Sequence, residues 1–443
     1  MAIAHQDLSK GAPIAQIPPS APHRRAVGSV GMWESLATTR RQDRVLHGAA
    51  KAANVVVGVV MLPFWLAGQH LAGRIAKRLG RASRDLGELP RPAPGERSLD
   101  VVVAELQAIP HRLRPTAWAT LRKGLVDLSL FMLTQKRQTA NFGYAYPRQF
   151  EHRVFNGGDG EPLAAVVGVH QEPRPGVVVV HGLLSSRLFD YVREIAVCAY
   201  YDWGFNVAVI DLRSFGLSEL LTPAPNTGGW KEGEDVIGAA RFLKGLGSTS
   251  VGVLGISLGA SAGMNAAHND GVDEAVDGGI LAISGPGDTR MAAAYLDSKL
   301  SVRDPFYPFS RGFDVMLVSR VRNLGWPSNV ADFHALMDAV VSPHYGLSTD
   351  EIYERSSAVN HIADARVPVL ILHAEDDPIV PVEHARMLEE AAAGNDRVRV
   401  WILPGGGHAA FDALDRRWTY AVYRGFFEAL ARYEPAVAAP VAA

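Results

Sequence analysis

Short apolar runs separated by longer segments of mixed polarity mark the chain from about residue 150 onward. The runs are continuous rather than alternating, which is typical of parallel strands buried on both faces of a sheet. Strands that alternate with helical segments predict a doubly wound α/β sheet. The predicted strands are Val177 to Val180, Asn206 to Ile210, Val251 to Leu254, Gly279 to Ile283, Val367 to Leu372 and Val398 to Leu403.

Two further segments precede these runs. Glu151 to Phe155 and Leu163 to His170 are β-prone and flank the glycine-rich sequence Gly157 to Gly160, which predicts a β-hairpin. We expect this hairpin to begin a core whose first part spans residues 146–284 and whose second part spans residues 361–433.

The alternation of strands and helices is interrupted between the two parts of the core. Residues 285–360 contain no clear strand and carry helical and aromatic stretches instead, among them Asp304 to Phe309, Phe313 to Val321, Trp326 and Phe333 to Val341. An insertion near the ligand-binding edge of an α/β sheet acts as a cap. We therefore expect a helical cap insertion at residues 285–360, which selects the ligand.

The chain before the predicted core divides into a tail and an extension. Residues 1–30 are rich in Ala, Pro, Ser and Gln and lack apolar periodicity, which predicts a disordered tail. Residues 31–145 predict an N-terminal helical extension, whose pattern from about Leu99 to Gln138 breaks near its prolines. At the other end, residues 434–443 predict a flexible tail.

The extension contains one strongly apolar segment. Residues 52–73 have no Asp, Glu, Lys or Arg, but they reach the roughly 20 residues of a spanning helix only by including Asn54, Gln69 and His70. Basic residues flank the segment, and Leu and Ile recur at helical spacing after it, as in a helix lying on an anionic surface. The sequence predicts either membrane association through residues 52–84 or a helix packed on the core or on a partner.

Charge and cysteine content narrow the classes of partner and compartment. The chain has 44 Lys and Arg against 46 Asp and Glu, a formal net charge of −2, and so gives no indication of nucleic acid as a partner. Cys198 is the sole cysteine, which excludes a disulfide within the chain and fits a reducing, cytoplasmic compartment.

The sequence Gly255-Ile256-Ser257-Leu258-Gly259 has the form G-x-S-x-G. A predicted strand precedes it and a helix-compatible run of small residues follows it. Strand, sharp turn and helix form the context of a nucleophile elbow, in which a serine hydroxyl is exposed at the edge of a sheet. The alternative is an ordinary glycine-rich turn.

A serine hydroxyl becomes a strong nucleophile when a histidine oriented by a buried carboxylate removes its proton. Asp377 follows the strand that ends at Leu372 and is our candidate acid, with Asp376 and Glu375 as rivals. The candidate base is His408, which comes after the last predicted strand and three glycines. The rival bases, which all lie too early in the chain for the order nucleophile, acid, base, are His361, His373 and His384.

Negative charge that develops on a carbonyl oxygen needs backbone N–H donors. The N–H of Leu258, directly after the serine, is one candidate, and the N–H of Leu183 in the loop His181 to Ser186 is the other. We expect His181 to shape this loop rather than to take part in chemistry. We expect Arg213, after the next strand, to pair locally in a structural turn.

With these residues in place, the chain resembles the α/β-hydrolase superfamily. Within it, the chain is similar to the subgroup of the bacterial YheT-type hydrolases and the animal ABHD-type lipid esterases. The segments that carry the resemblance are His181 to Ser186, Gly255 to Gly259, Pro343 to Gly346, Tyr353 to Ser357, Val367 to Leu370, Ala374 to Pro378 and Gly406 to His408. Two segments depart from the subgroup: Ala260-Ser261-Ala262, where the subgroup has another Gly and an early Asn, and Ser214, where related turns have Gly.

The resemblance implies an α/β-hydrolase fold and hydrolysis of carboxylic esters, often those of acyl lipids, with an N-terminal membrane helix in some members. We therefore expect a serine hydrolase with the catalytic residues Ser257, Asp377 and His408, acting on a small-molecule or lipid ester without a cofactor or metal. An acyltransferase with the same residues and a non-catalytic scaffold are the alternatives.

Overall fold

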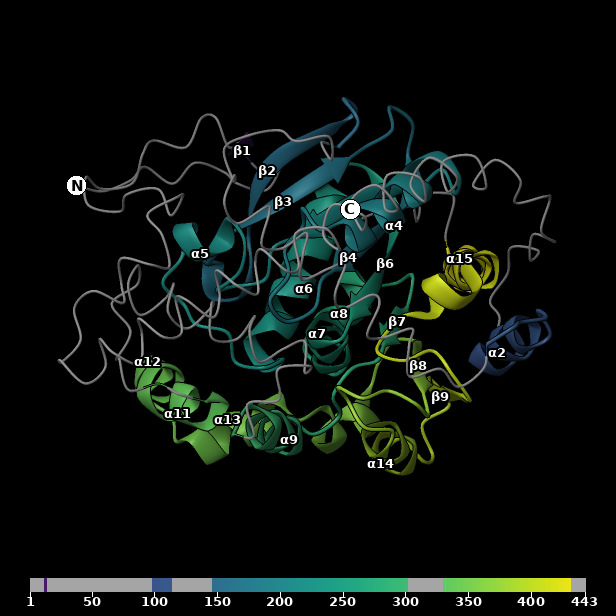
Figure 1. Ribbon diagram of the computed structural model, residues 1–443. Helices are drawn as coiled ribbons and strands as arrows, with labels where there is room; N and C mark the ends of the chain where they lie inside the picture. Colours follow the sequence, from purple (N-terminus) through teal and green to yellow (C-terminus); the bar gives the residue numbers. More distant parts are fainter. Residues whose placement is uncertain (1–11, 14–97, 114–145, 302–329, 331, 432–443) are drawn as a thin grey trace, which may run out of the picture.

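A computed structural model describes residues 12–13, 98–113, 146–301, 330 and 332–431 of the chain (Figure 1). Several sequence predictions lie outside these residues. They are the tail 1–30 apart from Ala12 and Pro13, the apolar segment 52–73 and its continuation to residue 84, the aromatic residues 304–326 of the cap, and the tail 434–443.

The predicted doubly wound α/β sheet is confirmed. Its strand order is β1-β2-β3-β5-β4-β6-β7-β8-β9, and the strands from β5 to β9 in this order are parallel. The strands are β1 (Ala12–Pro13), β2 (Phe150–Asn156), β3 (Pro162–Gly168), β4 (Arg174–Val180), β5 (Asn206–Ile210), β6 (Ser248–Ile256), β7 (Ile280–Ile283), β8 (Val369–Ala374) and β9 (Val398–Leu403).

The predicted hairpin is present as β2 and β3, which pair antiparallel across the 3₁₀ turn Gly158–Gly160. β3 also pairs antiparallel with β5 and so attaches the hairpin to the parallel strands. The chain turns to opposite sides of β4, since β5 and β6 are its two neighbours. Such a switch point leaves a crevice at the carboxyl ends of the strands, where α/β sheets bind ligands.

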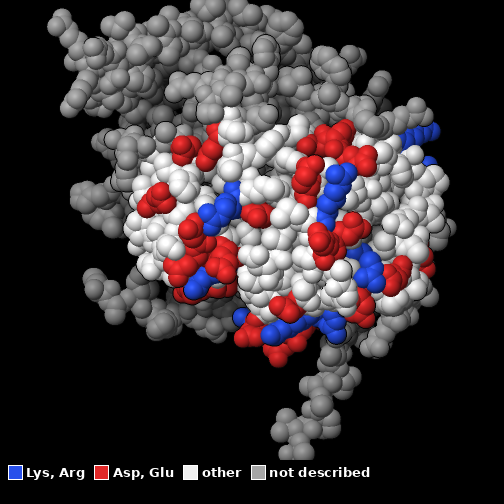
Figure 2. Space-filling model, turned by 90° about the horizontal axis from the view of Figure 1, so that it is seen from below, with Lys and Arg blue, Asp and Glu red and all other residues white. Residues whose placement is uncertain are grey.

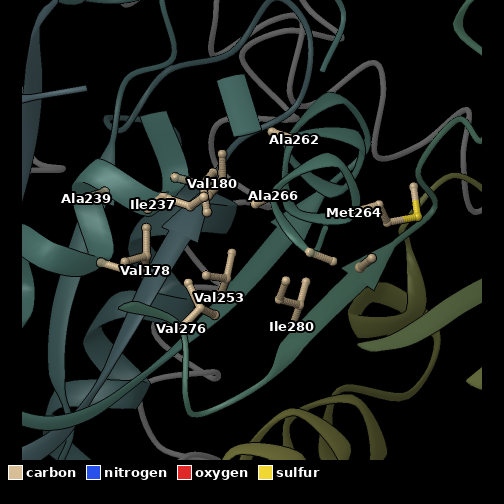
Figure 3. Close-up of a cluster of buried hydrophobic side chains, with 14 of the residues drawn as sticks. Val178, Val180, Ile237, Ala239, Val253, Ala262, Met264, Ala266, Val276 and Ile280 are labelled. Atoms are coloured by element: carbon tan, nitrogen blue, oxygen red, sulfur yellow. The ribbon is translucent and has the colours of Figure 1, made fainter. Parts of the chain in front are cut away.

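Each apolar strand contributes to two cores, because successive side chains point to opposite faces of the sheet. Val178 and Val180 of β4 face the core under α6 (Trp230–Gly245) and α7 (Leu258–Ala266), as Figure 3 shows. Val177 and Val179 face the core on the other side, under α4 (Asp190–Tyr201) and α15 (Phe411–Leu430). The continuous apolar runs in the sequence thus reflect burial on both faces.

The remaining helices complete the two layers and the cap (Figure 1). Those beside the core are α2 (Leu99–Gln107), α5 (Ser218–Leu221), α8 (Val272–Ala275), α14 (Glu383–Ala391) and the 3₁₀ turn Ile362–Asp364. Between β7 and β8 lie α9 (Thr289–Ser301), α11 (Phe333–Leu336), the π-helical turn Met337–Val341, α12 (Ser342–Tyr345), α13 (Thr349–Ser356) and the 3₁₀ turn Ala358–Asn360.

The side of the molecule that carries α9 and α11–α14 is seen in Figure 2. Acidic and basic side chains lie interspersed on the described part of this face. One ion pair of the cap joins Arg290 of α9 to Asp350 of α13. This mixture agrees with the nearly balanced charge of the whole chain. None of the helices within the described residues combines the length and the apolar character needed to cross a membrane.

The described part of the N-terminal extension packs on the core. Leu99, Val102, Val103 and Leu106 of α2 are buried in the same core as α15. A side chain on Gly425 of α15 would collide with Leu106, so the two helices lie in close contact there. The helix also covers the region of β9, the last strand of the sheet.

Replacement of Leu106 by alanine tests this packing. We expect Leu106→Ala to lower the free energy of unfolding by about 2–4 kcal/mol, because it removes buried methyl groups and leaves a cavity. Val101 lies on the same helix but is 48% exposed, so Val101→Ala is the matched control and should change stability by less than about 0.5 kcal/mol. Equal, small effects of both variants in denaturant unfolding would show that α2 is not docked.

Candidate active site

Ser257 lies at a sharp turn between β6 and α7. Its backbone has φ 56° and ψ −117°, a conformation that residues other than glycine rarely adopt, so the turn is strained. The Ser257 N–H donates to the carbonyl oxygen of Ile283 at 2.8 Å and ties the turn to β7. The serine therefore sits at the carboxyl edge of the sheet, beside the switch point.

The two glycines of the G-x-S-x-G motif allow three backbone segments to meet around Ser257. A Cβ atom at Gly255 would overlap the carbonyl group of Gly259. A Cβ atom at Gly259 would lie 2.7 Å from the carbonyl oxygen of His181 and closer still to that of Val180. Since the colliding atoms belong to the backbone, they cannot move aside as a side chain could. Glycine is therefore required at both positions of the motif for these backbone segments to pack together.

The hydroxyl of Ser257 lies within hydrogen-bond distance of the imidazole of His408. The distance from Oγ to Nε2 is 3.0 Å. On the other side of the ring, Nδ1 is 2.9 Å from Oδ2 and 3.2 Å from Oδ1 of Asp377. Because an ionised carboxylate only accepts, Nδ1 carries the proton and Nε2 accepts from the serine hydroxyl.

The loop after β8 holds the carboxylate of Asp377 in place. The side chain is buried, and Oδ1 accepts the N–H groups of Ile379 at 2.9 Å and Val380 at 3.0 Å. This turn closes over Pro378, which has no N–H of its own to satisfy. The loop therefore fixes the orientation of the carboxylate toward His408.

The two rival carboxylates lie elsewhere. Oδ1 of Asp376 accepts the N–H of Gly407 at 2.8 Å, so this side chain supports the loop that carries His408. Glu375 is exposed. Of the three consecutive acidic residues, Asp377 is the one whose carboxylate contacts the His408 ring.

The three rival histidines occupy structural positions. His373 is buried under the acid loop, with Nε2 2.9 Å from the carbonyl oxygen of Val380. Nδ1 of His384, on α14, accepts the N–H of Asp288 at 3.3 Å. His361 stacks on His268, with 4.5 Å between the ring centroids. The serine contact described above belongs to His408.

The loop after β4 lies against Ser257. A Cβ atom at Gly182 would be 3.1 Å from the Cβ of Ser257, so the peptide that joins Gly182 to Leu183 borders the serine. Leu258 is the first residue of α7, where a backbone N–H has no partner within the helix. The two predicted N–H donors therefore come from different elements on either side of Ser257.

His181 shapes this loop. Its Nδ1 lies 2.8 Å from the carbonyl oxygen of Gly182, and its Nε2 accepts the N–H of Leu212 at 3.2 Å. These partners require a neutral ring with the proton on Nδ1, and burial lowers the pKa of His181 in agreement. Since the ring holds the carbonyl of the peptide between Gly182 and Leu183, it also fixes the direction of the Leu183 N–H.

Two residues support the backbone on either side of His408: Ser284, which sequence reasoning missed, and Asp376, which it considered as a rival acid. The hydroxyl of Ser284, directly after β7, accepts the N–H of Ala409 at 3.0 Å. Asp376 holds Gly407 on the other side of the histidine, as described above. Ser284 is buried and has φ 51°. A serine directly after a central strand was the available signal, but its partner lies 125 residues away.

The prediction that Arg213 pairs locally is wrong. Its guanidinium is buried and pairs with Asp235 on α6, with Nε 2.8 Å from Oδ2. Nη1 donates to the hydroxyl of Tyr345 on α12 at 2.9 Å, and that hydroxyl donates to the carbonyl oxygen of Pro225 at 2.8 Å. Arg213 therefore joins the cap to the core. A fully buried cation requires such partners, and tertiary packing supplies them from distant segments.

The contacts among Ser257, His408 and Asp377 allow proton transfer from the serine hydroxyl. An imidazole that accepts from a serine hydroxyl and donates to a buried carboxylate can remove the hydroxyl proton, which makes the oxygen nucleophilic. Within the described ranges, no group of three or more His, Cys, Asp and Glu side chains is arranged to hold a metal ion.

Several known proteins are similar to the chain. A family model described as the alpha/beta hydrolase family matches residues 177–421. A monoacylglycerol lipase of Saccharomyces cerevisiae is 24% identical over 269 residues, 56% of this chain and 57% of the lipase. A Synechocystis protein provisionally named an esterase is 25% identical over 300 residues, 60% of this chain and 78% of that protein. The chain thus spans little more than half the length of the yeast relative.

A solved structure also resembles the chain. The structure of an esterase of Pyrococcus furiosus aligns with a TM-score of 0.46 at 16% sequence identity. The alignment covers 64% of this chain and 93% of the esterase.

Buried histidines around the site make stability dependent on pH. Burial, then the neighbouring His373, lowers the pKa of His384 to about 4 from its usual 6.5, and burial also lowers the pKa of His373. Between pH 6.5 and about 4 the unfolded chain binds a proton at His384 and the folded chain does not. Stability is therefore present above the unfolded pKa and is lost as the pH falls through this window.

We expect the free energy of unfolding to decrease as the pH falls from 6.5 to 4, and His384→Gln to make this decrease shallower. The glutamine carbonyl can still accept the N–H of Asp288 but does not titrate. The difference between the two proteins should be of the order of 3 kcal/mol across the window. Denaturant unfolding at a series of pH values measures it, and parallel curves for the two proteins would contradict the role of His384.

Proposed function

We propose that this chain, which belongs to the alpha/beta hydrolase family, is a serine hydrolase that cleaves carboxylic esters. Ser257 is the nucleophile, His408 the base and Asp377 the group that orients the imidazole. The observation that carries the proposal is the continuous contact from Ser257 Oγ through the His408 ring to Asp377 Oδ2, at 3.0 and 2.9 Å. The N–H groups of Leu183 and Leu258 form the oxyanion hole.

The reaction begins with transfer of the Ser257 proton to Nε2 of His408 as Oγ attacks the ester carbonyl carbon. The carboxylate of Asp377 stabilises the imidazolium that forms. The carbonyl oxygen becomes an oxyanion, which the N–H groups of Leu183 and Leu258 stabilise. His408 then donates its proton to the leaving alcohol, and an acyl-enzyme with Ser257 remains.

Water completes the cycle. His408 removes a proton from the attacking water molecule and returns it to Oγ as the acyl group leaves as a carboxylic acid. Throughout, the Nδ1 proton stays between His408 and Asp377, because both carboxylate oxygens face that nitrogen. His408 therefore accepts a proton and then donates it in each half of the reaction.

We propose an acyl lipid ester as the substrate class. The residues at positions 183 and 258, whose backbones we assign to the oxyanion hole, are both leucines, and their side chains belong to or pack against one apolar cluster. A monoacylglycerol lipase among the relatives supports the same class. The cap between β7 and β8 lies beside the carboxyl edge of the sheet and would enclose the acyl chain (Figure 1).

Replacement of the nucleophile tests the mechanism. We expect Ser257→Ala to lower kcat for p-nitrophenyl esters by at least about 10⁴-fold, because the attacking oxygen is removed while the fold is kept. Labelling by a fluorophosphonate probe should vanish as well. Ser261, one turn further along α7, is the matched control: Ser261→Ala should keep both turnover and labelling.

Three outcomes would contradict the proposal in different ways. Ester turnover of Ser257→Ala within a few-fold of the parent would exclude Ser257 as the nucleophile. A parent protein that neither labels nor turns over esters of any chain length would favour the scaffold. Transfer of the acyl group to an added alcohol, at the expense of hydrolysis, would favour an acyltransferase.

A further inference from the structure

The first helix of the cap, α9, is bound at both of its ends. Thr289 at its start donates its N–H to the hydroxyl of Ser357 at 3.0 Å and its own hydroxyl to the carbonyl oxygen of Ser356 at 2.9 Å. Towards its other end, the carboxylate of Asp297 accepts the N–H of Phe333 at 2.8 Å. These contacts fix the position of the helix relative to the rest of the described cap.

Tyr295 lies between these two points and reaches the loop that carries Asp377. Its hydroxyl donates to the carbonyl oxygen of Pro378 at 3.0 Å. Burial, followed by the charge of Asp377, raises the pKa of Tyr295, so the hydroxyl remains protonated at neutral pH. Pro378 directly follows Asp377 and lies inside the turn that this carboxylate closes. The cap thus binds the backbone next to the proposed triad acid.

The segment just before α9 reaches the far end of the same loop. The N–H of Asp288 donates to Nδ1 of His384, which lies at the start of α14. The side chain of Asp288 turns back and accepts the N–H of Met291 at 2.8 Å, which fixes the first turn of the helix. The α9 region therefore contacts the acid loop at two points: at Pro378, through Tyr295, and just past the end of the loop at His384, through Asp288.

The core also contacts the acid loop. His373, the second-last residue of β8, is buried and holds the carbonyl oxygen of Val380 through Nε2. The same Nε2 lies 3.8 Å from Oδ2 of Asp377. The acid loop is thus hydrogen-bonded both to His373 of the core and to Tyr295 of the cap. The cap is the part of the chain that we expect to select the ester.

We propose that Tyr295 is a positioning residue that couples the cap to the triad acid, because its hydrogen bond to Pro378 keeps the Asp377 carboxylate aligned with Nδ1 of His408. The inference rests on the proposed function and deepens it. A cap bound in this way contributes to the rate of the chemical step as well as to the choice of substrate. Small displacements of a catalytic group have large effects on rate, which is why one hydrogen bond matters here.

The variant Tyr295→Phe removes the hydroxyl and keeps the ring. We expect kcat for a short ester to fall about tenfold while KM stays within twofold, because alignment is lost and binding is not. A less well aligned carboxylate stabilises the imidazolium less, so the acid limb of the kcat/KM–pH profile should move to lower pH. The other titratable groups around the loop are unchanged in this variant: Asp288, His373, Asp376, Glu383 and His384.

Tyr345→Phe is the matched control. Tyr345 also joins the cap to the core through its hydroxyl, but its partners are Arg213 and Pro225, which lie away from the acid loop. Its loss leaves a buried guanidinium short of one acceptor and should lower Tm more than Tyr295→Phe does. The position of the acid limb in the pH profile should stay as in the parent.

A double-mutant cycle with Asp377→Asn separates positioning from general loosening. If Tyr295 acts through the carboxylate, Tyr295→Phe should have no further effect on kcat/KM in the Asp377→Asn background. Additive losses would overturn the inference, as would an unshifted acid limb in Tyr295→Phe or equal shifts in both tyrosine variants. Activity that survives Ser257→Ala would instead refute the proposed function itself.

Discussion

The close approach of the loop after β4 to the turn between β6 and α7 is the constraint on which the candidate site depends. It brings the peptide of Gly182 and Leu183 beside Ser257, and it is compatible only with hydrogen atoms in place of side chains at Gly255 and Gly259. The strained backbone of Ser257 follows from the same crowding. The strands that meet here are buried on both faces, and this packing stabilises the strained turn.

The parallel sheet brings residues that are far apart in the sequence to the same edge. Positions 257, 377 and 408 follow β6, β8 and β9, whose carboxyl ends lie along one edge. The loops between strand and helix then determine which atoms meet. Asp376 and Ser284 bind the backbone on either side of His408, and the turn over Pro378 orients Asp377. The position of the histidine ring is therefore set by contacts to the backbone on both of its sides and to Asp377.

The cap is joined to this core by hydrogen bonds as well as by apolar packing. Arg213, which pairs with α6, binds Tyr345 of the cap, and Tyr295 in the middle of α9 binds the carbonyl oxygen of Pro378 in the core. A hydrogen bond requires a donor and an acceptor at a defined distance and angle, so each contact is specific in position, unlike apolar packing, which tolerates small shifts. In the proposed coupling between cap and acid loop, the hydrogen bond from Tyr295 to Pro378 is the contact that transmits the position of the cap.

The sequence alone determined the strands, the hairpin and the glycine-bounded turn at Ser257, because strand burial and turn geometry leave a local signature in apolar runs and glycine positions. It also proposed the order of Ser257, Asp377 and His408 along the chain. The tertiary structure decided which of three consecutive acidic residues faces the histidine, that Arg213 binds Asp235 and Tyr345, that α2 packs on α15, and that Tyr295 reaches Pro378. These contacts join segments far apart in the chain, and their geometry depends on how helices pack on the finished sheet, which no local pattern encodes.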